Sequence, residues 1–306
     1  MSTVYCLCMI KNEADIIESY LRYHLHIFDG IVILDNGSTD RTMEIISLMQ
    51  KEGLPIEVKE DDSLAFAQGD KTTELIDYTF KHFAPDLIFP LDVDEFLTAP
   101  ASPENPRRLI DRLQTGKKIY YLEQDYTYFP VHINEKELFI PRRITYASPI
   151  KDYWPKVVVS REIWESYSPV ISGGNHDLLF DKGDLEQEIL APLKIRHFPY
   201  RSLEQAKSKI AVGWINTLAS YSYNVGHNYH WQALFEILKH SNFNLRLEDI
   251  LEYNEVHVPM NFSFCCSLDL KYTGENEVNA VRNLLNYTEA LAARYREQVR
   301  LQGQGK

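Results

Sequence analysis

The sequence lacks the features that mark several classes of protein. Its 306 residues contain no run of about eighteen apolar residues, so no membrane-spanning segment is predicted. Only four cysteines occur, with no C-x-x-C pair and no Cys/His spacing that suits zinc. Cys6 and Cys8 share one face of a predicted strand, and a disulfide between the neighbours Cys265 and Cys266 would be strained. We therefore expect four reduced thiols.

An excess of basic residues is also missing. The chain has 32 Lys and Arg against 44 Asp and Glu, a formal net charge of −12 at pH 7. Without a strongly basic stretch, this balance argues against a nucleic-acid partner and against a basic helix on anionic lipid. The first residues lack the basic leader of a secretory signal, so a cytoplasmic protein is expected. Hydrophobic residues make up 44% of the chain, enough for one large α/β domain or for one domain with a helical extension.

Two carboxylates follow a predicted buried strand. Residues 86–91 are apolar on both faces, as in a parallel sheet, and the motif Asp92-Val93-Asp94-Glu95 comes directly after them. Because side chains alternate in extended backbone, Asp92 and Asp94 point the same way. Such oxygen ligands at the carboxyl end of a strand suit Mg²⁺ or Mn²⁺ carrying a diphosphate. A solvated acidic loop is the alternative interpretation of the motif.

A second acidic loop lies at the tip of another predicted strand, residues 30–34. Asp35 ends this strand, and Gly37 permits a tight turn into a predicted helix over residues 43–49. Ser38 or Thr39 is the expected N-cap of that helix. Capping does not explain Asp35, whose carboxylate could accept hydrogen bonds from a nucleobase or a ribose.

The first predicted strand, residues 3–10, leads into Lys11-Asn12-Glu13. Asn12 can cap the amphipathic helix that follows, and the carboxylates of Glu13 and Asp15 suit its positive end. A ligand role for Asn12 or Glu13 and a purely structural role both remain open.

These three motifs together resemble the family-2-type glycosyltransferases. The likeness is greatest to the bacterial branch with K-N-E-A, D-N-x-S-x-D and D-x-D-E-F, carried here by Lys11-Asn12-Glu13, residues 35–40 and residues 91–97. It covers roughly the first hundred residues. The resemblance implies a GT-A fold, a nucleotide-diphosphate sugar donor (UDP-sugar first), Mn²⁺ or Mg²⁺ as cofactor, inversion at the anomeric carbon and a place in polysaccharide biosynthesis.

The order of predicted elements agrees with such a fold. Strands and helices alternate up to Leu97, which predicts a parallel sheet with right-handed crossovers. Strands at residues 118–123 and 155–160 have no crossover helix between them, which indicates added antiparallel strands. We therefore expect an α/β protein of GT-A (Rossmann-like) type, with a mixed, mainly parallel sheet and a C-terminal helical extension.

The expected domain organisation follows from the same pattern. A catalytic domain would span residues 1–200, with a nucleotide-sugar half at 1–98 and an acceptor half at 99–200. Residues 201–306 would form a helical extension packed on it. Its helices are predicted at residues 203–221, 229–240 and 278–299.

The resemblance also implies roles for residues outside the three motifs. Lys71, near the start of a predicted helix over residues 68–83, would approach the donor phosphates, although a solvated lysine explains it equally well. Arg196 could pair with phosphate oxygens, and His197 would be a third metal ligand beside Asp92 and Asp94. The donor-binding candidates are Asn12, Glu13, Asp35, Lys71, Asp92 and Arg196.

The proton acceptor is sought in the segment Ser172–Asp177, where a glycine pair precedes Asn175-His176-Asp177. Asp177, or His176, would deprotonate the acceptor hydroxyl. The family's usual E-D pair is replaced here, and a simple glycine turn is the alternative. Glu95 is the next candidate.

The sequence thus predicts a metal-dependent, inverting glycosyltransferase acting on a glycan, lipid-linked or small-molecule acceptor. A haloacid-dehalogenase-type phosphatase normally carries its D-x-D after the first strand, and a sugar-1-phosphate nucleotidyltransferase needs a glycine-rich loop where Lys11-Asn12-Glu13 stands. A non-catalytic carbohydrate- or nucleotide-binding protein with the same fold stays open as the alternative.

Overall fold

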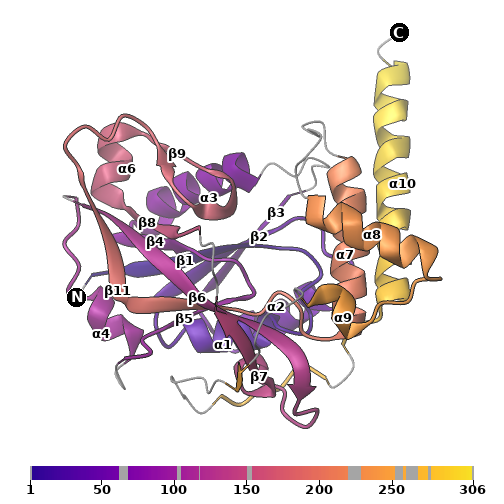
Figure 1. Ribbon diagram of the computed structural model, residues 1–306. Helices are drawn as coiled ribbons and strands as arrows, with labels where there is room; N and C mark the ends of the chain where they lie inside the picture. Colours follow the sequence, from indigo (N-terminus) through magenta and orange to yellow (C-terminus); the bar gives the residue numbers. More distant parts are fainter. Residues whose placement is uncertain are drawn as a thin grey trace.

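The computed structural model describes most of the chain (Figure 1). The described ranges are residues 2–61, 68–101, 105–116, 118–149, 154–219, 229–251, 258–259, 268–274 and 277–304. Cys6 and Cys8 are buried free thiols, as expected. Cys265, Cys266 and the predicted end of a helix at Tyr221 lie outside the described residues.

A parallel half forms one side of a ten-stranded sheet. Its strands are β1 (Val4–Ile10), β2 (Gly30–Asp35), β3 (Ile56–Glu60) and β4 (Leu87–Pro90). They lie in the order β4-β1-β2-β3, and every neighbouring pair is parallel. The predicted alternation of strands and helices is therefore confirmed, and the strands' carboxyl ends meet at one edge of the sheet.

Helices cover both faces of this half because the buried strands are apolar on both sides. The helices are α1 (Ile17–His24), α2 (Thr42–Lys51) and α3 (Gln68–Phe83). Ile31 and Ile33 of β2 belong to the core cluster that contains residues of α1 and α2, whereas Val32 belongs to the cluster that contains residues of α3. The two-residue period of an extended strand explains this division.

Antiparallel strands extend the sheet beyond β4. The added strands are β5 (Glu95–Thr98), β6 (Lys118–Ile133), β7 (Ile144–Pro149), β8 (Lys156–Ser160), β11 (Glu186–His197) and β12 (Val258–Pro259). Strand β8 joins the halves, since it is antiparallel to both β4 and β6. One long pair, β6 with β11, is parallel. The predicted strands at 118–123 and 155–160 are thus present.

Short elements connect these strands. They are α4 (Pro106–Ile110), α5 (Ile140–Arg143), α6 (Arg161–Tyr167), β9 (Val170–Ile171), the 3₁₀ turn η1 (Gly173–Asn175) and β10 (Leu178–Leu179). Strands β9 and β10 form a separate two-stranded sheet.

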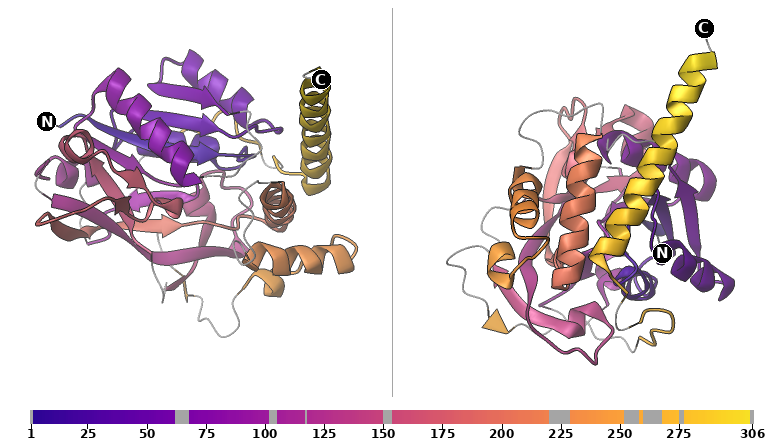
Figure 2. Two further views of the ribbon diagram at one scale, coloured as in Figure 1. Left: turned by 90° about the horizontal axis from the view of Figure 1, so that it is seen from above. Right: turned by 90° about the vertical axis from the view of Figure 1, so that its right-hand side faces the viewer.

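Helices dominate the C-terminal third. They are α7 (Leu203–Leu218), α8 (Tyr229–His240), α9 (Leu247–Ile250) and α10 (Ala280–Gln304). Helix α7 lies between α8 and α10, and the group stands at the edge of the sheet where the parallel strands end (Figure 2). The α/β fold with a mixed sheet and C-terminal helices is therefore confirmed, while the predicted domain boundaries stay predictions.

Polar contacts tie the C-terminal segment to the parallel half. The buried carboxylate of Glu18 in α1 accepts hydrogen bonds from the backbone N–H groups of residues 271–273, each at 2.8 Å. The side-chain amide of Asn286 in α10 donates to the carbonyl of Thr39 at 3.1 Å. In the described part of the chain, no helix has the length and apolar character needed to cross a membrane.

Candidate active site

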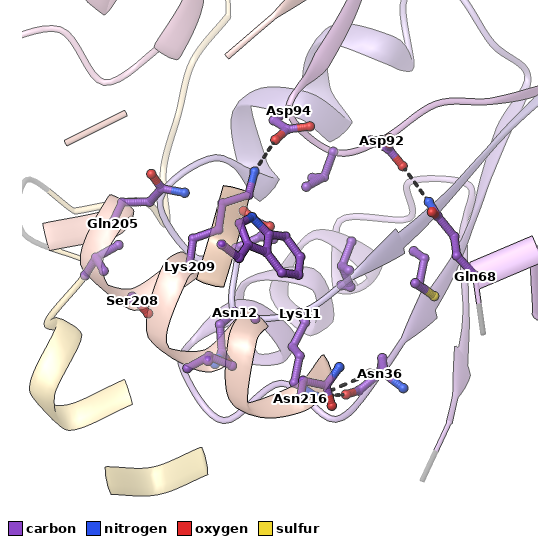
Figure 3. A pocket seen from close by; sticks show the side chains of 18 of the residues that line it. Lys11, Asn12, Asn36, Gln68, Asp92, Asp94, Gln205, Ser208, Lys209 and Asn216 are labelled. Atoms are coloured by element: carbon purple, nitrogen blue, oxygen red, sulfur yellow. Dashed lines mark hydrogen bonds and ion pairs between the residues drawn. The ribbon is translucent and has the colours of Figure 1, made fainter. Parts of the chain in front are cut away.

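A pocket of about 360 Å³ opens where the parallel strands end (Figure 3). One wall comes from the loops after β1, β2 and β4, and the other from helix α7, with Trp231 of α8 and Val278 adding to it. The polar and aromatic residues that line it include Lys11, Asn12, Glu13, Asn36, Gln68, Asp92, Asp94, His197, Ser208, Lys209, Asn216 and Trp231. This is the size and the place expected of a ligand site in an open α/β sheet.

The turn that carries Asp92 and Asp94 is fixed by Glu95. The Glu95 carboxylate accepts a hydrogen bond from the backbone N–H of Asp92 at 3.0 Å, and the Glu95 N–H donates to the Asp92 carbonyl at 3.0 Å. Gln124 of β6 also donates to the Glu95 carboxylate. Glu95 is buried, so it orients the turn from below and does not face the pocket.

Each carboxylate of the motif is held by a lysine. The ammonium of Lys156 in β8 lies 2.5 Å from Asp92 and 3.1 Å from Glu95, and that of Lys209 in α7 lies 2.7 Å from Asp94. Burial alone would raise the pKa of the Asp94 carboxyl, but Lys209 and His197 outweigh it and hold this pKa well below its usual range. Asp94 is therefore an anion in this site.

His197 stands beside Asp94 at the end of β11. Its Nε2 is 3.6 Å from the Asp94 Oδ2, the same oxygen that Lys209 approaches. Strand β11 brings it there by pairing antiparallel with β5, opposite Glu95 in the register. The predicted proximity of Asp92, Asp94 and His197 is thus present, since all three line one pocket.

Glu13 is the remaining carboxylate of the pocket wall. It pairs with Arg201 at 2.6 Å, and Arg201 also binds Asp15 at 2.7 Å. Burial raises the pKa of Glu13 to about 7 although Arg201 and Lys209 oppose the shift. Glu13 therefore exchanges protons near neutral pH, unlike Asp94.

Asn12 does not cap the first helix as expected. Helix α1 begins only at Ile17, and Asn12 takes a left-handed conformation with φ of 59°. Its side-chain oxygen accepts from the N–H of Thr39 at 2.7 Å, which fixes the loop after β2. The expected N-cap of α2 at Ser38 or Thr39 is also wrong, because α2 begins at Thr42 and the residue at its N-cap position, Arg41, makes no side-chain cap hydrogen bond.

Lys11 points across the same wall. Its ammonium donates to the Asn36 carbonyl at 2.6 Å and lies 4.9 Å from the ring centroid of Tyr287 in α10. Burial lowers the pKa of Lys11 to about 8, and Arg294 of α10 adds to the effect. A cation thus remains on this wall at neutral pH.

Three predicted donor contacts do not line the pocket. The Asp35 carboxylate is buried and accepts from the N–H of Ser38 at 3.1 Å. Lys71 forms an ion pair with Asp61. Arg196 donates to the hydroxyl of Tyr128 at 2.8 Å and lies 3.0 Å from Asp125. In this arrangement each of these side chains is engaged within the protein.

The two predicted proton acceptors also lie outside the pocket lining. Asp177 accepts hydrogen bonds from the hydroxyl of Tyr121 and from the ammonium of Lys182, both at 2.6 Å. Burial would raise the pKa of Asp177, but these contacts lower it, which makes the carboxylate a weaker base. The His176 Nδ1 lies 2.9 Å from the carbonyl oxygen of Pro155.

Sequence reasoning missed the pocket residues Lys209 and Trp231, and Lys156 beneath the pocket. Lys156 opens an otherwise apolar strand, Lys-Val-Val-Val-Ser, which is a signal for a buried charge with a partner. Polar residues at positions 205, 208, 209 and 216 of α7 could have indicated a polar helix face that lines a pocket. Nothing in the sequence indicates that Trp231 reaches the pocket.

The side chains of Asp92, Asp94 and His197 suit Mg²⁺ or Mn²⁺ only if the substrate supplies further ligands. Among the described residues, no group of three or more His, Cys, Asp or Glu side chains is close enough to hold a metal on its own. These ions usually bind through one or two carboxylates together with substrate phosphates and water. Asp92, Asp94 and His197 around one open pocket agree with that shared mode of binding.

Comparisons with known proteins give only distant likenesses. No protein-family model and no curated protein matches the chain. A mannosyltransferase from Pyrobaculum calidifontis in complex with GDP-Man and Mn²⁺ is 12% identical, with a TM-score of 0.37 over 99% of this chain and 79% of that one. Glucosyl-3-phosphoglycerate synthase from Mycobacterium tuberculosis with Mn²⁺, UDP and glucosyl-3-phosphoglycerate is 17% identical, with a TM-score of 0.36 over 70% and 80%. At such scores the likenesses decide neither fold nor activity, which rest on this chain's own residues.

Proposed function

We propose that this protein is a glycosyltransferase of the GT-A type. It would transfer a sugar from a nucleotide-diphosphate donor, a UDP-sugar first, to a hydroxyl acceptor with inversion. The observation that carries the proposal is the pocket at the strand ends, where Asp92, Asp94 and His197 meet Lys11 and Lys209. Such a mixture of carboxylates and cations suits a diphosphate that arrives with a divalent ion.

Asp92, Asp94 and His197 would hold Mn²⁺ or Mg²⁺. When bound, such an ion offsets the negative charge that develops on the leaving diphosphate. Glu95 and Lys156 keep Asp92 and its turn in place, and Lys11 adds positive charge on the same wall. Asn12 supports the site by fixing the loop that carries Asn36.

The proton of the acceptor hydroxyl needs a base inside the pocket. Glu13 lines the pocket, and its pKa of about 7 lies near the working pH at which general bases are most effective. We therefore propose Glu13 in place of Asp177 or His176. The acceptor would lie against helix α7, where Gly213 leaves room for Trp231, since an added Cβ would sit 3.0 Å from the indole. Indole rings provide the flat apolar surface on which sugar rings stack.

A non-catalytic protein that binds a nucleotide sugar is the second candidate. Donor hydrolysis without acceptor separates the two, because a transferase consumes donor slowly and a binding protein does not. Purified protein would be incubated with UDP-glucose, UDP-galactose, UDP-N-acetylglucosamine and GDP-mannose, with and without Mn²⁺. No donor consumption in any of them would contradict the proposal.

Asp94→Asn tests the metal assignment. This variant removes one anionic ligand and should abolish the Mn²⁺-dependent part of donor binding. A donor at about 100 times its dissociation constant adds about 2.7 kcal/mol to stability, which is a thermal shift of about 4 °C for a chain of this length. Asp184→Asn, at an exposed turn residue, is the matched control and should keep the shift. An undiminished shift in Asp94→Asn would return Asp94 to a structural role.

A further inference from the structure

Helix α7 places a lysine directly on the acidic motif. The Lys209 ammonium lies 2.7 Å from the Oδ2 of Asp94 and 3.3 Å from the carbonyl oxygen of Pro199. The same Asp94 oxygen is 3.6 Å from His197. Figure 3 shows the Lys209 side chain reaching from the helix across the pocket to Asp94. A lysine from the C-terminal helices therefore neutralises one carboxylate of the acidic motif, Asp94.

The position of this ammonium conflicts with a metal ion on the same atoms. A divalent ion held by Asp94 and His197 would lie beside the Asp94 oxygen that Lys209 now approaches. A divalent ion and an ammonium bound to the same Asp94 oxygen repel one another. Metal binding therefore favours a new position for the Lys209 ammonium. Lysine suits such a move because it is a compact charge on a flexible stem.

A diphosphate would offer the displaced ammonium a new partner. Lysine is a common phosphate binder, and Lys209 has three N–H donors. Lys209 lines the pocket together with Asp92 and His197, so a diphosphate bound at the metal comes within reach of the same side chain. Lys207, two residues earlier in α7, differs because it pairs with the half-exposed Glu204 and does not line the pocket.

We propose that Lys209 is a built-in counter-ion that neutralises Asp94 in the metal-free protein and moves to the donor diphosphate when a divalent ion takes Asp94. The inference rests on the proposed function for its ligand, the diphosphate of a nucleotide sugar. It assigns the C-terminal helices a direct part in donor binding. Metal and lysine then compete for Asp94, while metal, lysine and diphosphate bind together.

Competition between Lys209 and a metal ion for Asp94 predicts that one substitution changes the Mn²⁺ affinity and the diphosphate affinity in opposite directions. Lys209→Met should tighten Mn²⁺ binding to the nucleotide-free protein, because the competing cation is gone. The same variant should weaken the binding of inorganic pyrophosphate in saturating Mn²⁺ by about 10- to 100-fold, the value of one charge-assisted hydrogen bond. Lys207→Met is the matched control and should leave both affinities within about twofold of wild type.

The test uses two binding measurements on the whole chain. Electron paramagnetic resonance follows Mn²⁺ alone, and calorimetry follows inorganic pyrophosphate with Mn²⁺ present. Lys209→Gln, which keeps a donor but no charge, replaces Lys209→Met if the latter does not fold. Lys209→Arg keeps the charge and should retain the wild-type Mn²⁺ affinity.

The outcomes separate this inference from the proposed function. An unchanged or weaker Mn²⁺ affinity in Lys209→Met and Lys209→Gln would overturn the competition, and unchanged pyrophosphate affinity would overturn the diphosphate contact. Neither result touches donor hydrolysis by the wild type, which is the readout for glycosyl transfer. A tighter Mn²⁺ affinity and a weaker pyrophosphate affinity in Lys209→Met, without any donor hydrolysis by the wild type, would support the movement of Lys209 and contradict the proposed transferase activity.

Discussion

Replacement of Lys156 by methionine should destabilise the protein strongly, because this buried lysine forms ion pairs with both Asp92, which lines the pocket, and Glu95 beneath it. Lys156 is 2% exposed and Glu95 is 2% exposed, whereas Asp92 is 32% exposed. Loss of the ammonium leaves the Glu95 carboxylate buried without its cation, with neutral donors from Gln124 and the Asp92 backbone. Removal of one partner from a buried ion pair costs about 3–5 kcal/mol.

This loss converts into a measurable shift in melting temperature. An unfolding entropy of about 2.1 cal/mol/K per residue gives about 0.64 kcal/mol/K for the whole chain, so Lys156→Met should melt about 5–8 °C below wild type. The cost should also grow with pH. Burial already raises the pKa of Glu95 to about 7 while Lys156 opposes the shift, so loss of Lys156 raises this pKa further and the cost relative to wild type should grow as pH rises above about 7.

Urea denaturation at pH 5.5 and pH 8 tests both statements. Lys118→Met is the control, since Lys118 pairs with the exposed Glu188 and should cost less than about 1 kcal/mol. Adding Glu95→Gln to Lys156→Met should recover part of the loss, because the buried charge is then removed as well. A Lys156→Met protein as stable as Lys118→Met, or a cost that does not increase with pH, would contradict a buried charge pair between Lys156 and Glu95.

Two further predictions concern proton exchange elsewhere in the fold. His24 is fully buried with Nδ1 3.1 Å from the Tyr20 carbonyl oxygen, and burial lowers its pKa to about 3. Below pH 6.5 only the unfolded chain takes this proton, so the wild type should lose roughly 3 kcal/mol between pH 7 and pH 4 relative to His24→Gln, as measured by urea denaturation. Equal pH slopes in the two proteins would contradict the assignment of a neutral imidazole. Glu13→Gln should lower turnover by about 10²–10⁴-fold at unchanged donor affinity, and wild-type turnover should rise through pH 7 as Glu13 loses its proton. Asp177→Asn should stay within about threefold of wild type, and a large loss there instead would return the base to Asp177.

The parallel half could be predicted because its signals are local. The helix predicted at residues 68–83 is α3 without any shift, and β2 follows the predicted strand with one further residue, Asp35. Continuous apolar runs and helical periodicity depend only on nearby residues. The N-cap of α2 was predicted wrongly because Ser38 and Thr39 both have capping side chains, whereas the backbone starts the helix only at Thr42 and leaves Arg41 at the cap position.

The carboxylates of the candidate site were also visible in the sequence, but their partners were not. Asp92 and Asp94 both line the pocket, but they lie in a turn after β4, which ends at Pro90, and not in the extended backbone from which their direction was predicted. Lys156 and Lys209 lie 64 and 115 residues further along the chain. Such pairings depend on how β8 and α7 pack, which no local pattern reports. The predicted ligands Lys71 and Arg196 failed to reach the pocket lining for the same reason, because Asp61 and Asp125 engage them first.

The contacts of the C-terminal helices give them a role that their sequence does not reveal. Apolar periodicity predicted α7 as an ordinary packing helix, yet this helix supplies Lys209, Ser208 and Asn216 to the pocket. Its register is held from both sides, by Ser202, which accepts from the N–H of Gln205 at 3.1 Å, and by Tyr287 of α10, which donates to Asn216 at 2.9 Å. A shift of α7 by one turn would move the Lys209 ammonium about 5.4 Å from Asp94. The position of α10 therefore bears on the charge balance of the acidic motif through its contact with α7.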